Sequence, residues 1–191
     1  MTPDNTRERI IESARLLVQD ASYDGFSFRD IAERVGIRKA SIYYHFETKE
    51  SLAVAMLNQA TDGFGQWASQ MERKTPIERL HAYCFDFYLA RLQAGKKLCP
   101  GGAFTAAWPN LGEKVRQAVN RLFDAQHRFV KQALTDASAA DSGYKGENPD
   151  ETASWFIACV QGAIVTARAR GEQQLFGRLC SRTLQQLPLS G

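Results

Sequence analysis

The residues best suited to chemistry form a run of basic, ring and hydroxyl side chains between positions 29 and 49. The segment around them, residues 26–52, reads FSFRDIAERVGIRKASIYYHFETKESL. Lysine, arginine, tyrosine and serine side chains donate hydrogen bonds to phosphate oxygens, and those that enter a DNA groove also contact base edges. The segment therefore predicts contact with nucleic acid rather than a catalytic reaction.

Two short helices are needed to hold these side chains. Ser27 is a good N-cap for the first, because its side-chain oxygen can accept a hydrogen bond from a free backbone N–H group. Gly36 ends that helix, since glycine enters the left-handed backbone region without a steric cost, and the second helix starts at about Arg38. Such a pair is the geometry of a helix-turn-helix motif, which places its second helix in the major groove. The expected inward-facing residues are Ile31, Ala32, Val35, Ile42 and Phe46.

The segment resembles the DNA-binding domain of TetR/AcrR-type repressors. The resemblance rests on SFRDIA at 27–32, VGI at 35–37, ASIYYHF at 40–46 and KESL at 49–52. It departs from the family at Ala40, where the family often has glycine. A helical second domain and a homodimer joined through the last two helices are what the resemblance implies.

The resemblance also implies individual DNA contacts. Four positions match residues that touch backbone phosphates in the family, and four match residues near base edges or flanking phosphates. Arg38 is added because the stretch from 29 to 39 holds four basic and two acidic residues, a local net charge of +2. The expected contacts are Tyr43, Tyr44, His45 and Lys49 in the first group, Arg29, Lys39, Ala40 and Ser41 in the second, and Arg38.

Cys99 is a candidate sensor. It lies in LCPGGAF, next to the start of an expected helix and just after Lys96 and Lys97. Positive charge at a helix N-terminus favours the reactive thiolate. The turn resembles that of NemR-type electrophile sensors within the same family, and Arg168 would add positive charge if it faced inward. The alternative is a buried, inert cysteine.

An excess of aromatic side chains at helical spacing marks the rest of the chain. Such residues are most often core, but several rings with polar tips between helices also predict a small-molecule pocket. The expected pocket residues besides Cys99 and Arg168 are Trp67, His81, Tyr88, Phe104, Trp108, Phe123, His127 and Trp155. A soft-metal site formed by His81, Cys84 and Cys99 is an alternative sensor, although no dense His/Cys cluster supports it.

The composition of the chain limits the classes of protein to which it can belong. The chain has 191 residues, 44% of them hydrophobic and 24% charged, with a formal net charge of +3. No apolar run approaches the roughly 20 residues that span a bilayer, and the first ten residues lack the pattern of a secretory signal. We therefore expect a cytoplasmic protein with four reduced cysteines. No catalytic motif, phosphate loop or metal-binding motif is present, so neither an enzyme nor a cofactor is expected.

Helical periodicity runs through the whole chain and predicts an all-α fold. Residues 1–50 form the expected helix-turn-helix DNA-binding domain, and residues 51–191 a helical ligand-binding and dimerisation domain of six helices. One helix is expected over 49–73, with a bend at Gly63 and Gly65, another over 76–94, a third over 110–137, and a loop over 138–148.

The function predicted from these features is a repressor that binds a palindromic operator as a homodimer. An inducer, or modification of a cysteine, would release it. The alternatives are a regulator that senses a soft metal, an architectural DNA-binding protein without a sensor, and a helical ligand-binding or scaffold protein whose helix-turn-helix segment no longer binds DNA.

Overall fold

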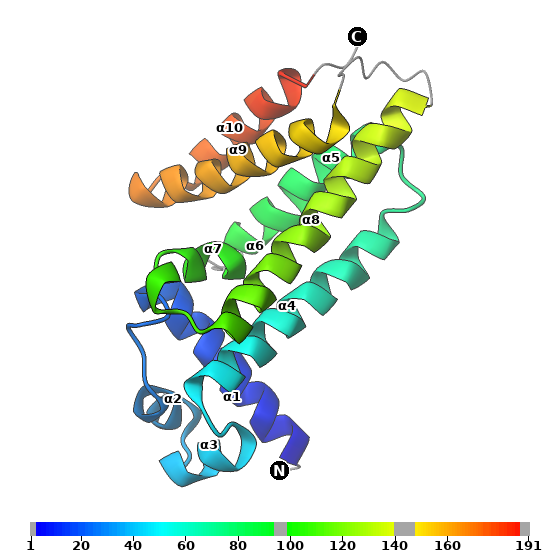
Figure 1. The fold of residues 1–191 in the computed structure, drawn as a ribbon. Coiled ribbons are helices and arrows are strands. Elements are labelled where there is room, and N and C mark those ends of the chain that lie inside the picture. Colours follow the sequence, from blue (N-terminus) through cyan, green and yellow to red (C-terminus); the bar gives the residue numbers. More distant parts are fainter. Residues whose placement is uncertain (1–2, 94–98, 140–147, 188–191) are drawn as a thin grey trace. The chain divides into compact units, whose positions relative to one another are not determined.

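The structure is a computed structural model, which describes residues 3–93, 99–139 and 148–187. Within these residues all regular secondary structure is helical (Figure 1), which confirms the predicted all-α class. None of the described helices has both the length and the hydropathy needed to cross a membrane.

The chain divides into two compact units. The first comprises residues 1–62 and 100–122, and the second comprises residues 63–99 and 123–191. Two long helices, α4 (Lys49–Gln70) and α8 (Glu113–Ala139), begin in the first unit and end in the second. The domain boundary predicted after residue 50 stays a prediction.

The first unit holds the helix-turn-helix motif against a bracing helix. Its other elements are α1 (Pro3–Ala21), α2 (Phe28–Val35), α3 (Lys39–His45), α7 (Pro100–Thr105) and the 3-10 turn η2 (Trp108–Asn110). Burial of apolar side chains from α1 to α4 and from α7 supplies the driving force for packing two helices that are too short to be stable alone. The fully buried members include Ile10, Ala14, Ile31, Ile42, Leu52, Leu57 and Phe104.

Hydrogen bonds between distant segments tie the first unit together. Gln59 on α4 donates to Glu8 on α1 at 2.6 Å, and Asn110 donates to Asp24 at 2.7 Å. Arg121 on α8 donates to Asn58 at 3.2 Å. The segment from 100 to 122 is therefore tied to the loop between α1 and α2 as well as to α4.

The second unit is a helical bundle. Besides the ends of α4 and α8, it contains α5 (Pro76–Ala82), the π-helix η1 (Tyr83–Leu89), α6 (Ala90–Gln93), α9 (Pro149–Ala169) and α10 (Gln173–Gln185). Helix α10 packs against α9 and also against η1. Its most buried large side chains include Phe64, Leu80, Tyr83, Leu134, Phe156, Val160 and Phe176.

Several helix boundaries differ from the predictions. The helix expected over 76–94 contains the π-helical segment η1, whose i→i+5 bonding the periodicity of apolar residues did not predict. Helix α4 continues without a break through Gly63 and Gly65 to Gln70, and the bend expected there stays a prediction. A glycine costs only about 1 kcal/mol in a helix, and burial of Phe64 between the two offsets that cost. Helix α8 begins at Glu113 rather than at Asn110, which belongs to η2. Most of the loop expected over 138–148 lies outside the described residues.

Candidate nucleic-acid interface

Helix α2 is fixed at both ends by side-chain and glycine caps. Asp30 N–H donates to Ser27 Oγ at 3.4 Å, and Ser27 N–H donates back to Asp30 Oδ2 at 2.6 Å. The Ser27 hydroxyl also donates to Asp30 Oδ2 at 2.8 Å, and this bond, together with the weaker effect of the bond from Ser27 N–H, lowers the pKa of Asp30. Gly36 ends the helix at φ 72°, with its N–H bonded to Ala32 O at 2.9 Å. The predicted N-cap and terminating glycine are confirmed.

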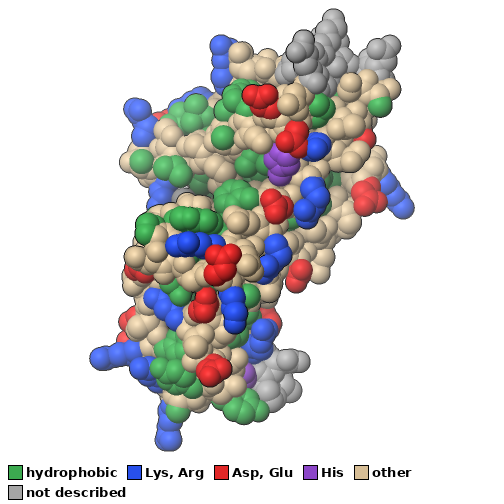
Figure 2. Space-filling model, viewed as in Figure 1, with side chains coloured by type: hydrophobic (Ala, Val, Ile, Leu, Met, Phe, Trp, Pro, Cys, Tyr) green, Lys and Arg blue, Asp and Glu red, His purple; other side chains and the backbone are tan. Residues whose placement is uncertain are grey.

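Helix α3 presents a polar face to solvent and an apolar face to the unit's core. Ile42 is fully buried, as is nearly all of Phe46 just after the helix. The opposite face leaves Tyr43 52% and Tyr44 83% exposed, and Arg38, Lys39 and Ala40 are exposed as well, whereas Ser41 and His45 are half-buried. Figure 2 shows Lys and Arg side chains projecting from the surface over α2 and α3, with acidic side chains among them.

A groove of about 340 Å³ lies beside α3. It is bounded by the start of α2, by α3 and by the segment entering α4. Lys39 Nζ lies 5.8 Å from the centroid of the Tyr43 ring, and that ring meets Phe28 edge-on at 5.2 Å. Of the nine predicted contacts, Lys39, Tyr43 and Lys49 line this groove, and the other six do not. The lining residues are Phe26, Ser27, Phe28, Lys39, Tyr43, Glu47, Thr48 and Lys49.

Lys49 has an internal role that its sequence position did not reveal. Its Nζ donates to Phe26 O at 2.5 Å and lies 4.2 Å and 4.7 Å from the ring centroids of Phe26 and Tyr23. Burial lowers the pKa of this ammonium group, while the carboxylates of Asp24 and Asp30 act in the opposite direction. An ammonium carries three donors, and within the described residues Phe26 O accepts from one of them.

Arg29 is exposed and paired with an acid on its own helix. Its Nε lies 3.0 Å from Glu33 Oε1, and both side chains are largely exposed. An exposed pair of this kind contributes about 0.3–0.5 kcal/mol. Arg29 could therefore leave Glu33 and pair with another anion at little cost in free energy.

The described part of the second unit contains a buried polar network. Tyr83 and Tyr88 both donate to Gln126 Oε1, at 2.7 and 2.5 Å, and Gln161 Nε2 donates to Tyr88 Oη at 2.9 Å. Cys99 Sγ lies 3.4 Å from the same Tyr88 oxygen and is only 4% exposed. Burial raises the pKa of both tyrosines well above the usual range for a phenol, and the nearby Cys99 thiol adds a smaller increase.

The residues predicted to line a pocket are spread over different surroundings. Trp67 packs among the rings of Phe64, Phe87 and Phe129, at 4.8 to 5.6 Å between centroids. Phe104 and Trp108 belong to the first unit, and there Phe104 contacts Tyr23 at 5.5 Å.

The remaining predicted pocket residues lie near the surface of the second unit. His81 is exposed and stacks on Phe85 at 4.4 Å. His127 Nε2 lies 3.1 Å from both Asp150 O and Ser154 Oγ. Phe123 is half-buried, Trp155 is 40% exposed and Arg168 is exposed. Only Tyr88 and Cys99 of the ten share a network, and the pocket as a set stays a prediction.

The cysteines do not form the alternative metal site. The interaction of the Cys84 thiol with that of Cys180 raises the pKa of Cys84 well above the usual range, and burial adds to the increase. In the described part of the chain, no group of three His, Cys, Asp or Glu residues is placed to hold a metal ion. Lys96 and Lys97, expected to act on Cys99, lie outside the described residues.

Sequence reasoning missed the pairing of Tyr83 with Tyr88. The two are five residues apart, which places them on different faces of an ordinary α-helix. The π-helical turn of η1 alters that relation, and a local signal for such a turn is hard to find in one sequence.

Comparison with known proteins covers both parts of the chain. Residues 10–56 match the family model for bacterial regulatory proteins of the tetR family, and residues 76–182 match the tetracyclin repressor-like C-terminal domain. Over 83 residues the chain is 32% identical to the biofilm operon icaADBC HTH-type negative transcriptional regulator IcaR of Staphylococcus aureus. That match covers 42% of this chain and 45% of IcaR. The chain thus spans less than half the length of this relative.

Solved structures extend the likeness to the whole fold. A TetR-family transcriptional regulator from Agrobacterium tumefaciens superposes with a TM-score of 0.92 at 26% identity, covering 98% of this chain and 100% of the other. The reduced form of E. coli NemR gives a TM-score of 0.82 at 19% identity, covering 96% and 98% of the two chains. The NemR likeness concerns the fold alone.

Proposed function

The chain belongs to the TetR family of bacterial regulatory proteins, and we propose that it is a repressor that binds a palindromic DNA operator as a homodimer. A small-molecule inducer acting on the second unit would release it. The observation that carries the proposal is the solvent-facing side of α3, where basic and ring side chains stand opposite a buried Ile42. Members of this family are regulators rather than enzymes, in line with the lack of a catalytic motif.

The DNA contacts would come from α3 and the groove beside it. Lys39 and Tyr43 border that groove, and an ammonium next to a phenol suits a backbone phosphate. Tyr44 is the most exposed ring of the helix and would reach beyond the groove. The full set of proposed contacts is Arg29, Arg38, Lys39, Ala40, Ser41, Tyr43, Tyr44, His45 and Lys49.

A homodimer would supply the specificity that one short helix lacks. A single recognition helix reads only a few base pairs, whereas a two-fold dimer reads a palindrome. Helix α9 supports the proposed seam through an exposed stripe of small and apolar residues spaced three and four apart. Such a stripe permits close approach of a second helix. Its members are Trp155, Ala158, Gly162, Val165 and Ala169.

Release from DNA would require an inducer that binds one conformation better than the other. The hydroxyl and amide groups of Tyr83, Tyr88, Gln126 and Gln161 offer donors and acceptors for a polar ligand group that replaced one of their mutual bonds. Because α4 and α8 are continuous through both units, a shift at one end of either helix could be passed along it.

Modification of Cys99 is a second candidate trigger. Its thiol adjoins the Tyr88 hydroxyl within the same network, so an adduct on sulfur would disturb the groups that a ligand would contact. Modification of Cys99, as in a NemR-like sensor, and binding of a ligand would therefore act on the same hydrogen-bond network.

Salt dependence of DNA binding tests the proposal. The protein is used to select a duplex from a randomised library, and its affinity is measured across a range of salt concentrations. We expect Lys39→Ala to weaken binding and to reduce the magnitude of the log K against log salt slope by about 0.9 per subunit, because one phosphate contact is lost. Arg73→Gln, an exposed charge in the second unit, is the matched control. A wild-type protein that selects no sequence, or binds without salt dependence, would exclude the repressor function.

A further inference from the structure

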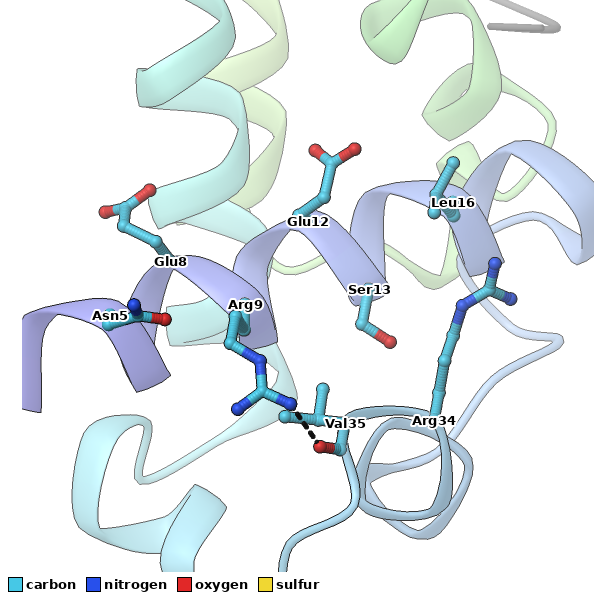
Figure 3. Close-up of a pocket in the computed structure, with 8 residues that line it drawn as sticks. All are labelled: Asn5, Glu8, Arg9, Glu12, Ser13, Leu16, Arg34 and Val35. Atoms are coloured by element: carbon cyan, nitrogen blue, oxygen red, sulfur yellow. Dashed lines mark hydrogen bonds between the residues drawn. The ribbon is translucent and has the colours of Figure 1, made fainter. Parts of the chain in front are cut away.

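A second groove lies in the first unit, between α1 and the C-terminal end of α2 (Figure 3). Its volume is about 900 Å³. It is separate in its lining from the groove beside α3, because the two share no residue. The lining residues are Asn5, Glu8, Arg9, Glu12, Ser13, Leu16, Arg34 and Val35.

The acidic residues of this groove have other partners and point away from its interior. Figure 3 shows Glu8 and Glu12 on the side of α1 that faces away from α2, whereas Arg9 and Ser13 point toward α2. Glu8 accepts a hydrogen bond from Gln59 at 2.6 Å, and Glu12 forms an ion pair with Arg15. The interior is therefore dominated by the two arginines.

Ser13 places an unsatisfied hydroxyl at the floor of the groove. The residue is only 6% exposed, and its Oγ is buried with no hydrogen-bond partner. A buried polar atom without a partner is unfavourable, and native proteins rarely leave one unless a ligand or water completes it. Its hydroxyl can donate one hydrogen bond to an acceptor in the groove.

The arginines supply positive charge on both sides of that hydroxyl. Arg9 Nη2 donates to Val35 O at 2.6 Å, which anchors its guanidinium at the end of α2. Arg34 rises from α2 toward Leu16 (Figure 3) and is exposed. Among residues 3–93, 99–139 and 148–187, Arg34 makes no ion pair or side-chain hydrogen bond. A guanidinium of this kind is well suited to bind the two oxygens of an oxyanion.

We propose that this groove binds a small oxyanion, a phosphate or carboxylate group, held by Arg34, Arg9 and the Ser13 hydroxyl. The ligand would bridge α1 and α2 and so stabilise the unit that contains the helix-turn-helix motif. The same chemistry has two sources, a free anion and a backbone phosphate of bound DNA. The experiment below separates them.

The first arm uses the full chain without DNA. The thermal unfolding midpoint is followed by circular dichroism in sodium phosphate and in sodium chloride of equal ionic strength and pH. Phosphate also stabilises proteins in general by exclusion from their surface, so the difference between variants is the readout. If a free anion binds, wild type gains about 3 °C more from saturating phosphate than Ser13→Ala or Arg34→Gln does. Arg73→Gln, whose residue lies outside the groove, should respond as wild type.

Ser13→Ala is informative because it should not harm the fold. It removes a hydroxyl that has no partner, so its midpoint in chloride should equal or exceed that of wild type. A lost phosphate response in this variant would then report the site and not a damaged protein.

The second arm rests on the proposed function and measures selected-duplex binding in chloride buffer. If the oxyanion is a DNA phosphate, Arg34→Gln lowers the magnitude of the salt slope by about 0.9 per subunit, and Arg73→Gln does not. A variant-dependent phosphate response identifies a free anion instead. Equal phosphate responses together with an unchanged slope would overturn the site. The first arm needs no DNA. It therefore still shows whether a free anion binds in the groove even if the protein proves not to be a repressor.

Discussion

Lys49 and Cys99 show how single side chains in this protein combine internal contacts with proposed external ones. The Lys49 ammonium is held by Phe26 O and by the rings of Phe26 and Tyr23. These contacts fix the loop that leads into α2, so loss of Lys49 would weaken DNA binding through the loop as well as through any lost phosphate contact. Cys99 is buried beside Tyr88, which makes its reactivity a question of access to the thiol.

The sensor role of Cys99 can be tested by a single substitution. We expect N-ethylmaleimide to reduce operator affinity of the wild type at least tenfold and to leave Cys99→Ser within about twofold of its untreated value. The reason is steric, because a site only 4% exposed has no room for an adduct without repacking. Operator titrations before and after treatment, with mass spectrometry of the modified residue, provide the measurement.

Cys159→Ser is the control for that experiment, since Cys159 is a half-buried thiol on α9. Equal loss of affinity in wild type and Cys99→Ser would show that Cys99 is an inert core residue.

At the scale of elements, the π-helix η1 brings two tyrosine hydroxyls of the second unit to one hydrogen-bond acceptor. Five residues advance an α-helix by about 500°, which leaves positions i and i+5 roughly 140° apart. The wider π-helical turn brings such positions closer to one face. Tyr83 and Tyr88 accordingly share Gln126 Oε1 as acceptor. A continuous α-helix over the same residues would separate the two hydroxyls.

Tyrosine titration tests this arrangement. In the folded protein the pKa of Tyr83 and of Tyr88 is raised well above 10, and unfolding returns it to about 10. Their contribution to stability is therefore present below about pH 10 and is lost as the pH rises above that value. Of the six tyrosines in the chain, we expect these two to ionise only when the helical circular dichroism signal collapses.

The measurement is absorbance of tyrosinate against pH, recorded alongside circular dichroism. Tyr83→Phe should remove one of the two tyrosines that ionise only with unfolding. Smooth ionisation of all six tyrosines while the helices remain intact would contradict the buried network.

For the whole molecule, the proposed two-fold assembly depends on the exposed face of α9. Val165 is 60% exposed and Trp155 is 40% exposed, and the open space around Gly162 leaves room for another backbone. Large apolar side chains in solvent at helical spacing are typical of a contact surface. In a homodimer the same stripe would meet its own copy across the two-fold axis.

Val165→Glu tests that assembly. Two carboxylates facing each other across the axis would desolvate and repel, so we expect a monomer at micromolar concentration by sedimentation. Operator affinity should fall by about two orders of magnitude or more, because each half-site is then bound separately. Asn120→Glu, at an exposed position on α8, should keep the wild-type mass and affinity. A dimer that survived Val165→Glu would place the seam elsewhere.

The sequence by itself determined the local features of this protein. Ser27 with Asp30, Thr75 with Glu78, and Gly36 mark helix ends because capping depends on residues three or four apart. The apolar face of α3 also followed from spacing alone, and with it the polar face proposed to meet DNA.

Only the tertiary structure decided which distant side chains meet. It assigned Phe104 and Trp108 to the first unit, gave Lys49 its ring contacts, joined Tyr83 and Tyr88 at Gln126, and left Ser13 Oγ without a partner. Each of these depends on packing between segments tens of residues apart. Periodicity within a helix specifies which face is buried, but it does not specify what that face is buried against.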